Sequence, residues 1–321
     1  MSETQQSMNS SRHFDELPDA PPKRKIRLSW AGKLGIAVLV FWAIIVVIGP
    51  SISPYHEAEF LEESLFIVPG SDEKYPDTDF QPPSRIVLLG SDYMGRDTLS
   101  RILFGARTTI GISFIATILA YLIGVTLGIA AAVGYRFQYR GFTIIELDTV
   151  LSRLNDALLS IPSIMLGLVM IAALGSTIPL LIVLTGIIYA ASVFRIARSL
   201  GQEVMVSDFV EAARVRGEGL WWIITREILP NVAMPLATDF GLRFVWVILF
   251  ISALSFLGLG VQPPMSDWGS MVKENLPGLI YGSVAPLVPS LAIATLTISV
   301  NMIVDDISAQ TGGKLAKRMI S

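Results

Sequence analysis

Cysteine is absent from this 321-residue chain, and histidine occurs only twice. The first absence excludes a disulfide framework, thiolate chemistry and any cysteine-ligated metal. The two histidines, His13 and His56, both lie in polar stretches. A histidine metal site or a histidine-based catalytic triad is therefore not expected, and we predict no metal-binding residue.

Charge is also scarce, because only 16% of the residues are Asp, Glu, Lys or Arg and 52% are hydrophobic. Soluble domains have about 25% charged residues, so this chain is too apolar for one ordinary soluble domain. The net charge of −3 gives no indication of nucleic-acid binding, since the charges are sorted along the chain. We expect no nucleic-acid partner.

Motifs of catalysis are missing as well. The pairs Gly32-Lys33 and Gly313-Lys314 lack the upstream Gly and the following Ser or Thr of a phosphate-binding loop. There is no HExxH, no GxSxG and no Gly-rich dinucleotide turn. We therefore expect no catalytic residue, no cofactor and no ATP hydrolysis by this chain. Its apolar runs also lack the several carboxylates and histidines of a proton relay.

Long apolar runs are what the chain has instead. A bilayer core of about 30 Å needs about 20 apolar residues of helix, and six runs meet or approach that length. The sequence therefore predicts an all-α, polytopic membrane protein with six transmembrane helices, and a lipid membrane as its surroundings. The runs are approximately Ala31–Ile52, Thr108–Gly134, Ala157–Leu174, Ile178–Phe194, Leu236–Gly260 and Val284–Val304.

The connecting segments are unequal in basic charge. Counted with the N-terminus inside, the inner segments hold 17 Lys and Arg residues and the outer segments hold six. Basic residues concentrate on the cytosolic side of membrane proteins, which predicts that both termini are cytosolic. We therefore predict that the chain has five parts. They are a flexible cytosolic tail without a secretory signal at 1–29, a first transmembrane helix at 30–52, an acidic outer-face loop at 53–107, a five-helix core at 108–307 and a cytosolic C-terminal tail at 308–321.

The inner segment 199–231 is charged, helical in pattern and rich in small residues. Asp208 followed by Glu211 indicates a capping box that starts a helix. Ala212 and Ala213 are strong helix formers with small side chains, and Gly217 permits the turn that ends this helix. A second short helix is predicted from Leu220 to Leu229, closed by Pro230.

This segment resembles the EAA loop of ABC importer permeases. The resemblance rests on Glu211-Ala212-Ala213, on Gly217 four positions after Ala213, and on Leu229-Pro230. In that family the loop forms a coupling helix that docks in a cleft of the ATP-hydrolysing subunit. The resemblance thus implies that these six residues transmit motion from the ATPase to the membrane helices.

Two further stretches resemble C-type permease subunits of the dipeptide, oligopeptide and nickel importers. One is LGSDYMGRDTLSR at 89–101, in which we expect Asp97 to pair with Arg101 at i,i+4. The other is LSFLGLGVQPP at 254–264. The family implies a bacterial inner-membrane location, a second homologous permease subunit, two ATP-binding subunits and an extracytoplasmic solute-binding protein. It leaves the solute open among dipeptide, oligopeptide, opine-like conjugate and nickel chelate.

The fifth run contains two charges, Asp239 and Arg243, at i,i+4. An arginine near the midplane costs about 2.5–3.5 kcal/mol on insertion scales, so the pair is a candidate lining of the pore. Alternatively, the span begins later and Arg243 extends to the inner interface. Two other classes of function remain open: a self-contained secondary carrier, and a membrane scaffold or sensor. Co-purification with an ATPase would distinguish the importer from both.

Overall fold

The computed structural model describes residues 28–62, 78–134 and 144–320. In these ranges the chain is helical, with one isolated β-bridge between Ser91 and Asp97. The elements are α2 (Trp30–Ile52), α3 (Thr98–Gly134), α4 (Ile144–Leu159), α5 (Ser163–Leu174), α6 (Ile178–Met205), α7 (Asp208–Val215), α8 (Leu220–Trp222), the π-helical turn η3 (Ile223–Ile228), α9 (Leu229–Phe256), α10 (Trp268–Asn275), the 3-10 helix η4 (Leu276–Tyr281) and α11 (Leu287–Ile320).

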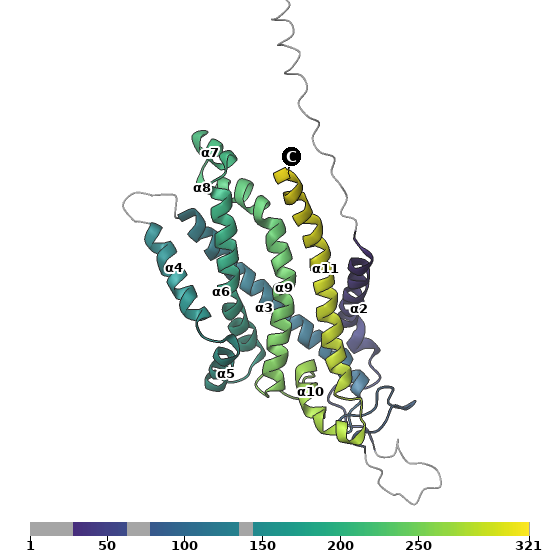
Figure 1. The fold of residues 1–321 in the computed structure, drawn as a ribbon. Coiled ribbons are helices and arrows are strands. Elements are labelled where there is room, and N and C mark those ends of the chain that lie inside the picture. The colour runs from purple at the N-terminus through teal and green to yellow at the C-terminus, as the bar shows by residue number, and fades with distance from the viewer. Residues whose placement is uncertain (1–27, 63–77, 135–143, 321) are drawn as a thin grey trace, which may run out of the picture.

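Five stretches in the described part of the chain are long and apolar enough to cross a membrane: α2, α3, α6, the run from α8 through α9, and the first part of α11. Counting the bent pair α4–α5 as one further span gives the six that the sequence predicts. Figure 1 shows α6, α9 and α11 running along the long axis of the molecule, with α3 crossing behind α9 and α11 at an angle. The all-α membrane fold is confirmed.

The third span differs from the continuous helix expected at 157–174, because α4 and α5 meet at an angle of 85°. The break coincides with Ile161 and Pro162. Proline disfavours the α conformation of the residue before it, and Pro162 itself has φ −54° and ψ 124° as the N-cap of α5. Hydropathy measures the length of the apolar run but gives no information about this change of direction.

Small residues line the most extensive helix contact, between α3 and α6. A Cβ atom placed on Gly124 would lie 2.6 Å from Val193 Cβ, and one placed on Gly128 would lie 2.7 Å from the Phe194 carbonyl oxygen. Residues without a Cβ let two backbones approach closely. The resulting van der Waals contact stabilises helix association in lipid, where the hydrophobic effect between helices is weak. These glycines therefore allow the tight α3–α6 contact.

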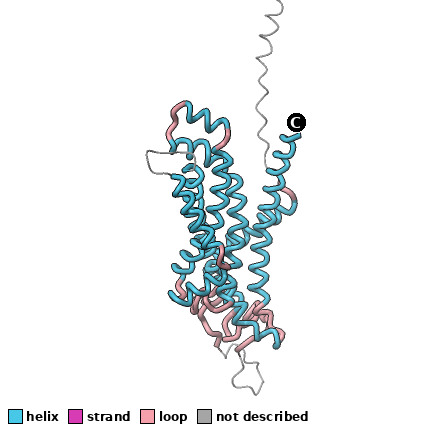
Figure 2. The backbone as a smooth tube through the Cα atoms, turned by 60° about the vertical axis from the view of Figure 1, so that its left-hand side comes forward, coloured by secondary structure: helices cyan, strands magenta, loops and turns pink. Residues whose placement is uncertain are grey.

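The two ends of the bundle carry different elements (Figures 1 and 2). The α7–α8 segment lies at one end, together with the last turns of α11. The start of α2 lies beside the second half of α11, because the Ser29 backbone N–H donates to Asp306 Oδ2 over 2.9 Å. The loops around α10 lie at the other end. Residues 308–320, expected as a tail, continue α11 as helix.

Candidate functional site

The helix expected from the capping box at 208–211 begins one residue earlier than that motif implies. Ser207 is the N-cap of α7, and no side-chain cap hydrogen bond is formed there. The predicted capping box of Asp208 and Glu211 is therefore wrong. Glu211 instead forms an ion pair with Arg214 on the next turn, at 3.0 Å, which leaves the carboxylate on the surface of the helix.

The EAA residues of α7 divide between two faces. Ala213 is fully buried, as is Val210 one turn before it, and both pack in a cluster with residues of α6, η3 and α9. Glu211 and Ala212 are exposed. The small side chain of Ala213 thus packs α7 against the bundle, while Glu211 and Ala212 lie on the outer surface. Val215, 82% exposed, lies near the tip of the same segment.

Gly217 forms the turn that the sequence predicts. Its φ of +82° lies in the left-handed region, which glycine adopts without the steric cost that a Cβ brings. The Gly217 N–H donates to the Arg214 carbonyl over 2.9 Å, and the Glu218 N–H donates to the Ala213 carbonyl over 3.1 Å. These bonds satisfy carbonyls at the end of α7 and reverse the chain toward α8.

The second helix of the loop does not end at Pro230. Leu220 to Phe256 is one helical run, in which Leu229 and Pro230 open α9 directly after the π turn η3. Proline lacks an N–H and its ring clashes with the carbonyl four residues before it in a regular α-helix. The wider π turn places the Leu229 N–H on the Ile224 carbonyl, five residues back. The loop is thus joined rigidly to the fifth span.

The charge pair lies near the middle of α9, in the candidate span Leu220–Phe256. Arg243 Nη2 donates to Asp239 Oδ1 over 2.9 Å, and the exposed fractions of the two side chains are 16% for Arg243 and 13% for Asp239. Arg243 is 13 residues before the end of α9 at Phe256, about 20 Å along the helix axis. The structure therefore brings together the two charges that the sequence singled out.

Two tyrosines from neighbouring helices complete the surroundings of this pair. Tyr121 on α3 donates its hydroxyl to Asp239 Oδ2. Tyr189 on α6 donates to the Trp246 carbonyl over 3.1 Å. The sequence singles out neither residue, because an aromatic residue inside an apolar run gives no sign of its hydrogen-bond partner. We define Tyr121, Asp239 and Arg243 as the interhelical polar cluster.

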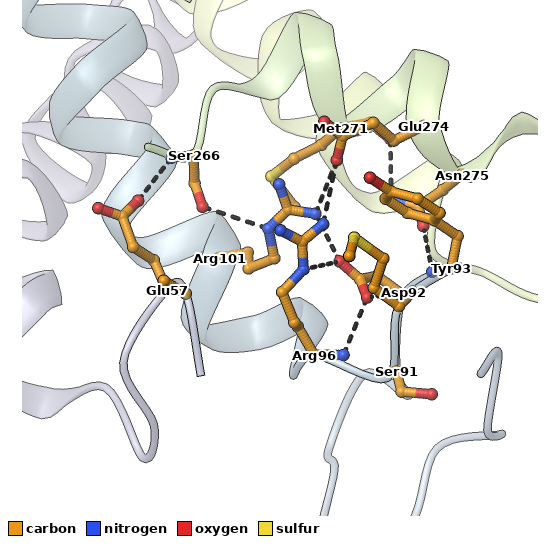
Figure 3. A network of polar contacts seen from close by, with 12 residues as sticks. Glu57, Ser91, Asp92, Tyr93, Arg96, Arg101, Ser266, Met271, Glu274 and Asn275 are labelled. Atoms are coloured by element: carbon orange, nitrogen blue, oxygen red, sulfur yellow. Dashed lines mark hydrogen bonds and ion pairs between the residues drawn. The ribbon is translucent and has the colours of Figure 1, made fainter. Parts of the chain in front are cut away.

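A second polar network lies at the opposite end from α7 (Figure 3). Asp92 accepts from Arg96 Nε at 2.8 Å and from Arg101 Nη1 at 2.5 Å, and both guanidinium groups also contact Glu274 of α10. Arg101 Nε reaches Ser266, whose backbone N–H donates to Glu57. The network joins the segment after α2, the start of α3 and α10.

The predicted pairing of Asp97 with Arg101 is wrong. Asp97 Oδ2 accepts from the backbone N–H and the hydroxyl of Ser100, at 2.8 and 2.6 Å. A carboxylate at a helix N-terminus caps the free N–H groups of the first turn, and this role turns it away from Arg101. The cationic side chain is neutralised by Asp92 and Glu274 instead.

The N-cap of α10 is a second buried carboxylate in this region. Asp267 Oδ2 accepts from the Ser270 N–H over 2.9 Å, and Oδ1 accepts from the Thr109 hydroxyl of α3 over 3.0 Å. Burial raises the pKa of this carboxyl.

Among residues 28–62, 78–134 and 144–320, no group of three or more His, Asp or Glu is placed to hold a metal ion.

Comparison with known proteins identifies the family. Residues 124–309 match the family described as "binding-protein-dependent transport system inner membrane component". The glutathione transport system permease protein GsiD of Pectobacterium atrosepticum is 32% identical over 78% of this chain and 81% of its own length. The dipeptide transport system permease protein DppC of Alkalihalophilus pseudofirmus is 33% identical over 73% of this chain and 74% of its own. The peptide transport system permease protein SapC of Escherichia coli is 29% identical over 89% of this chain and 93% of its own. The resemblance seen in the sequence is thereby confirmed, and the chain belongs to the binding-protein-dependent transport system inner membrane components, as a multi-pass permease subunit.

Proposed function

We propose that this chain forms half of the translocation pore of an ATP-driven peptide importer and is coupled to its ATPase through α7. The observation that carries the coupling role is the division of the EAA residues. Ala213 is buried against the bundle, whereas Glu211 and Ala212 are exposed at its end. A rigid segment with a small apolar residue and an ion-paired carboxylate on its exposed face is suited to a cleft on a partner.

The covalent continuity of this segment with a span supports transmission of motion. From Leu220 to Phe256 the chain is one helical run, so a displacement of the α7–α8 segment moves α9 with it. The buried Val210 and Ala213 also pack against η3 and α6. ATP binding at the partner would thus change the tilt of the spans that contain the interhelical polar cluster. The spans would then reopen on the opposite face.

The partners proposed for this chain are a second, homologous permease subunit, two ATP-binding subunits and an extracytoplasmic solute-binding protein. The orientation proposed for it places α7 and both termini in the cytosol, on the basis of 17 inner against six outer basic residues. The start of α2 contacts Asp306 in the second half of α11, the half that runs toward the α7 end, which supports one common side for all three. The substrate class follows from the peptide and dipeptide transporters among its relatives.

The test is co-purification of the tagged chain with the ATP-binding subunits, followed by ATP-dependent peptide uptake in proteoliposomes. Ala212→Trp enlarges an exposed side chain on α7 and should abolish both without unfolding the bundle. Ser51→Trp, at an exposed position at the far end of α2, is the matched control and should retain both. Uptake by this chain alone, driven by an ion gradient, would contradict the proposal and identify a secondary carrier.

A further inference from the structure

The guanidinium of Arg243 carries hydrogen-bond donors that its ion pair does not use. A guanidinium has five N–H donors, and the ion pair with Asp239 uses Nη2. Nε is buried and has no partner among the described residues. A charged group with unsatisfied donors inside an apolar span is costly, which indicates that something besides Asp239 completes its environment.

Asp239 has a second hydrogen-bond donor besides Arg243. Its Oδ2 accepts from the Tyr121 hydroxyl, while Oδ1 accepts from Arg243. Since Tyr121 comes from α3, the carboxylate is fixed between two helices and keeps a donor when the arginine moves. Arg243 can therefore turn toward a second anion without leaving Asp239 unpaired.

The cluster is also reachable from outside the bundle. Arg243 keeps 16% of its side chain exposed, beside the exposed Leu242 and Trp246 on α9. Lipid tails do not solvate a guanidinium, so partly exposed charges at membrane depth face a water-filled cavity or a binding partner. In the importer proposed above, that cavity is the translocation path.

We propose that Arg243 binds the C-terminal carboxylate of the peptide as it crosses the membrane. Arginine recognises carboxylates through paired N–H donors, and the unused donors of Arg243 offer such a pair. The contact would replace part of the hydration that the peptide carboxylate loses in the pore. This inference rests on the proposed importer function, and it identifies Arg243 as a specificity-determining residue.

The experiment compares two peptides of one sequence, one with a free C-terminal carboxylate and one with a C-terminal amide. Initial rates of ATP-dependent uptake are measured in proteoliposomes that contain the whole importer and an excess of its binding protein. The ratio of the two rates is the readout. Because the binding protein is unchanged, its own preference contributes the same factor for every variant.

The variant is Asp239→Asn with Arg243→Gln, which removes both charges together and so leaves neither buried alone. The ratio of free-acid to amide uptake should fall by about tenfold or more, the loss expected for a hydrogen bond to a charged group. The matched control is Asp148→Asn with Arg198→Gln. It removes a different ion pair, which joins α4 and α6 at 2.6 Å, and should leave the ratio unchanged.

Equal ratios in the wild-type protein and the charge-free variant would overturn the inference. If that variant does not fold, Arg243→Lys keeps the charge and removes the paired donors. The ratio of free-acid to amide uptake should then fall several-fold, and an unchanged ratio would also contradict the inference. Absence of ATP-dependent uptake of either peptide by the wild-type complex would instead overturn the proposed function itself.

Discussion

Arg101 Nη1 lies 2.5 Å from Asp92 Oδ2, and both side chains are almost fully excluded from solvent. Arg101 is the first cation of α3, and its second partner, Glu274, is 173 residues away in the chain. Arg101 and its two partners therefore join the start of α3 to α10 at the end of the bundle opposite α7. Burying charges is costly, and the network is stable only while each charge keeps its partners.

The first prediction is that Arg101→Met destabilises the protein by about 3–5 kcal/mol, because it leaves Asp92 and Glu274 with one fewer cation in a buried site. Thermal unfolding of the detergent-purified chain measures the effect. Arg107→Met on the same helix is the control, since Arg107 is exposed, and it should change stability by less than about 0.5 kcal/mol. Equal losses in the two variants would show that the network is not a source of stability.

The second prediction concerns the turn after α7. Gly217→Val should weaken association with the ATP-binding subunit and reduce uptake, while insertion into the membrane stays normal. No atom lies within 4 Å of a Cβ placed on Gly217. The penalty therefore comes from the φ of +82°, which costs a residue with a side chain about 1–2 kcal/mol and a β-branched residue more.

Gly219 provides a matched control two residues later. A Cβ there also meets nothing within 4 Å, but its φ is −72°, so Gly219→Val should be tolerated. Gly217→Asn should recover most of the association, since asparagine tolerates the left-handed region. If both valine variants behave alike, the backbone conformation at Gly217 is not what the loop requires.

The sequence predicted the features that depend on local composition. Apolar run length located the spans, and Gly217 marked the turn because its neighbours are strong helix formers. The bend at Ile161–Pro162 was also encoded locally, but hydropathy alone hides it. Pro230 misled the prediction, since a proline one residue into a new helix and a proline that ends a helix look alike in sequence.

Partners that are distant in the chain were not predictable from one sequence. The i,i+4 rule suggested Asp97 as the ion-pair partner of Arg101, yet Arg101 pairs with Glu274 on α10. Likewise the hydroxyl that holds Asp239 belongs to Tyr121, 118 residues earlier. Only the packing of α3 against α9 and α10 brings these groups together, and no local pattern specifies that packing.

The third prediction tests the close contact between α3 and α6. Gly124→Ala should destabilise the bundle by about 1–3 kcal/mol, the usual cost of overpacking, because its Cβ would lie 2.6 Å from Val193 Cβ and 2.8 Å from the Ala190 carbonyl oxygen. Gly111→Ala on the same helix meets no atom within 4 Å. It should be neutral or stabilise by up to about 1 kcal/mol through helix propensity. Thermal unfolding measures the stability of both variants. A Gly124→Ala protein as stable as the wild type would contradict the close packing of α3 against α6.

The last prediction fixes the orientation. Since the chain has no cysteine, single cysteines can be introduced without removing others. Val215 is 82% exposed near the tip of α7, and Tyr281 is 75% exposed at the end of η4, in the loops at the opposite end. Tyr281→Cys should react with a membrane-impermeant maleimide in intact spheroplasts, whereas Val215→Cys should react only after the membrane is permeabilised. Both substitutions are at exposed positions, so loss of folding should not confuse the result. The reverse pattern would place α7 outside, where no ATP-binding subunit can reach it, and would remove the coupling role of Glu211, Ala212 and Ala213 together with the proposed direction of transport.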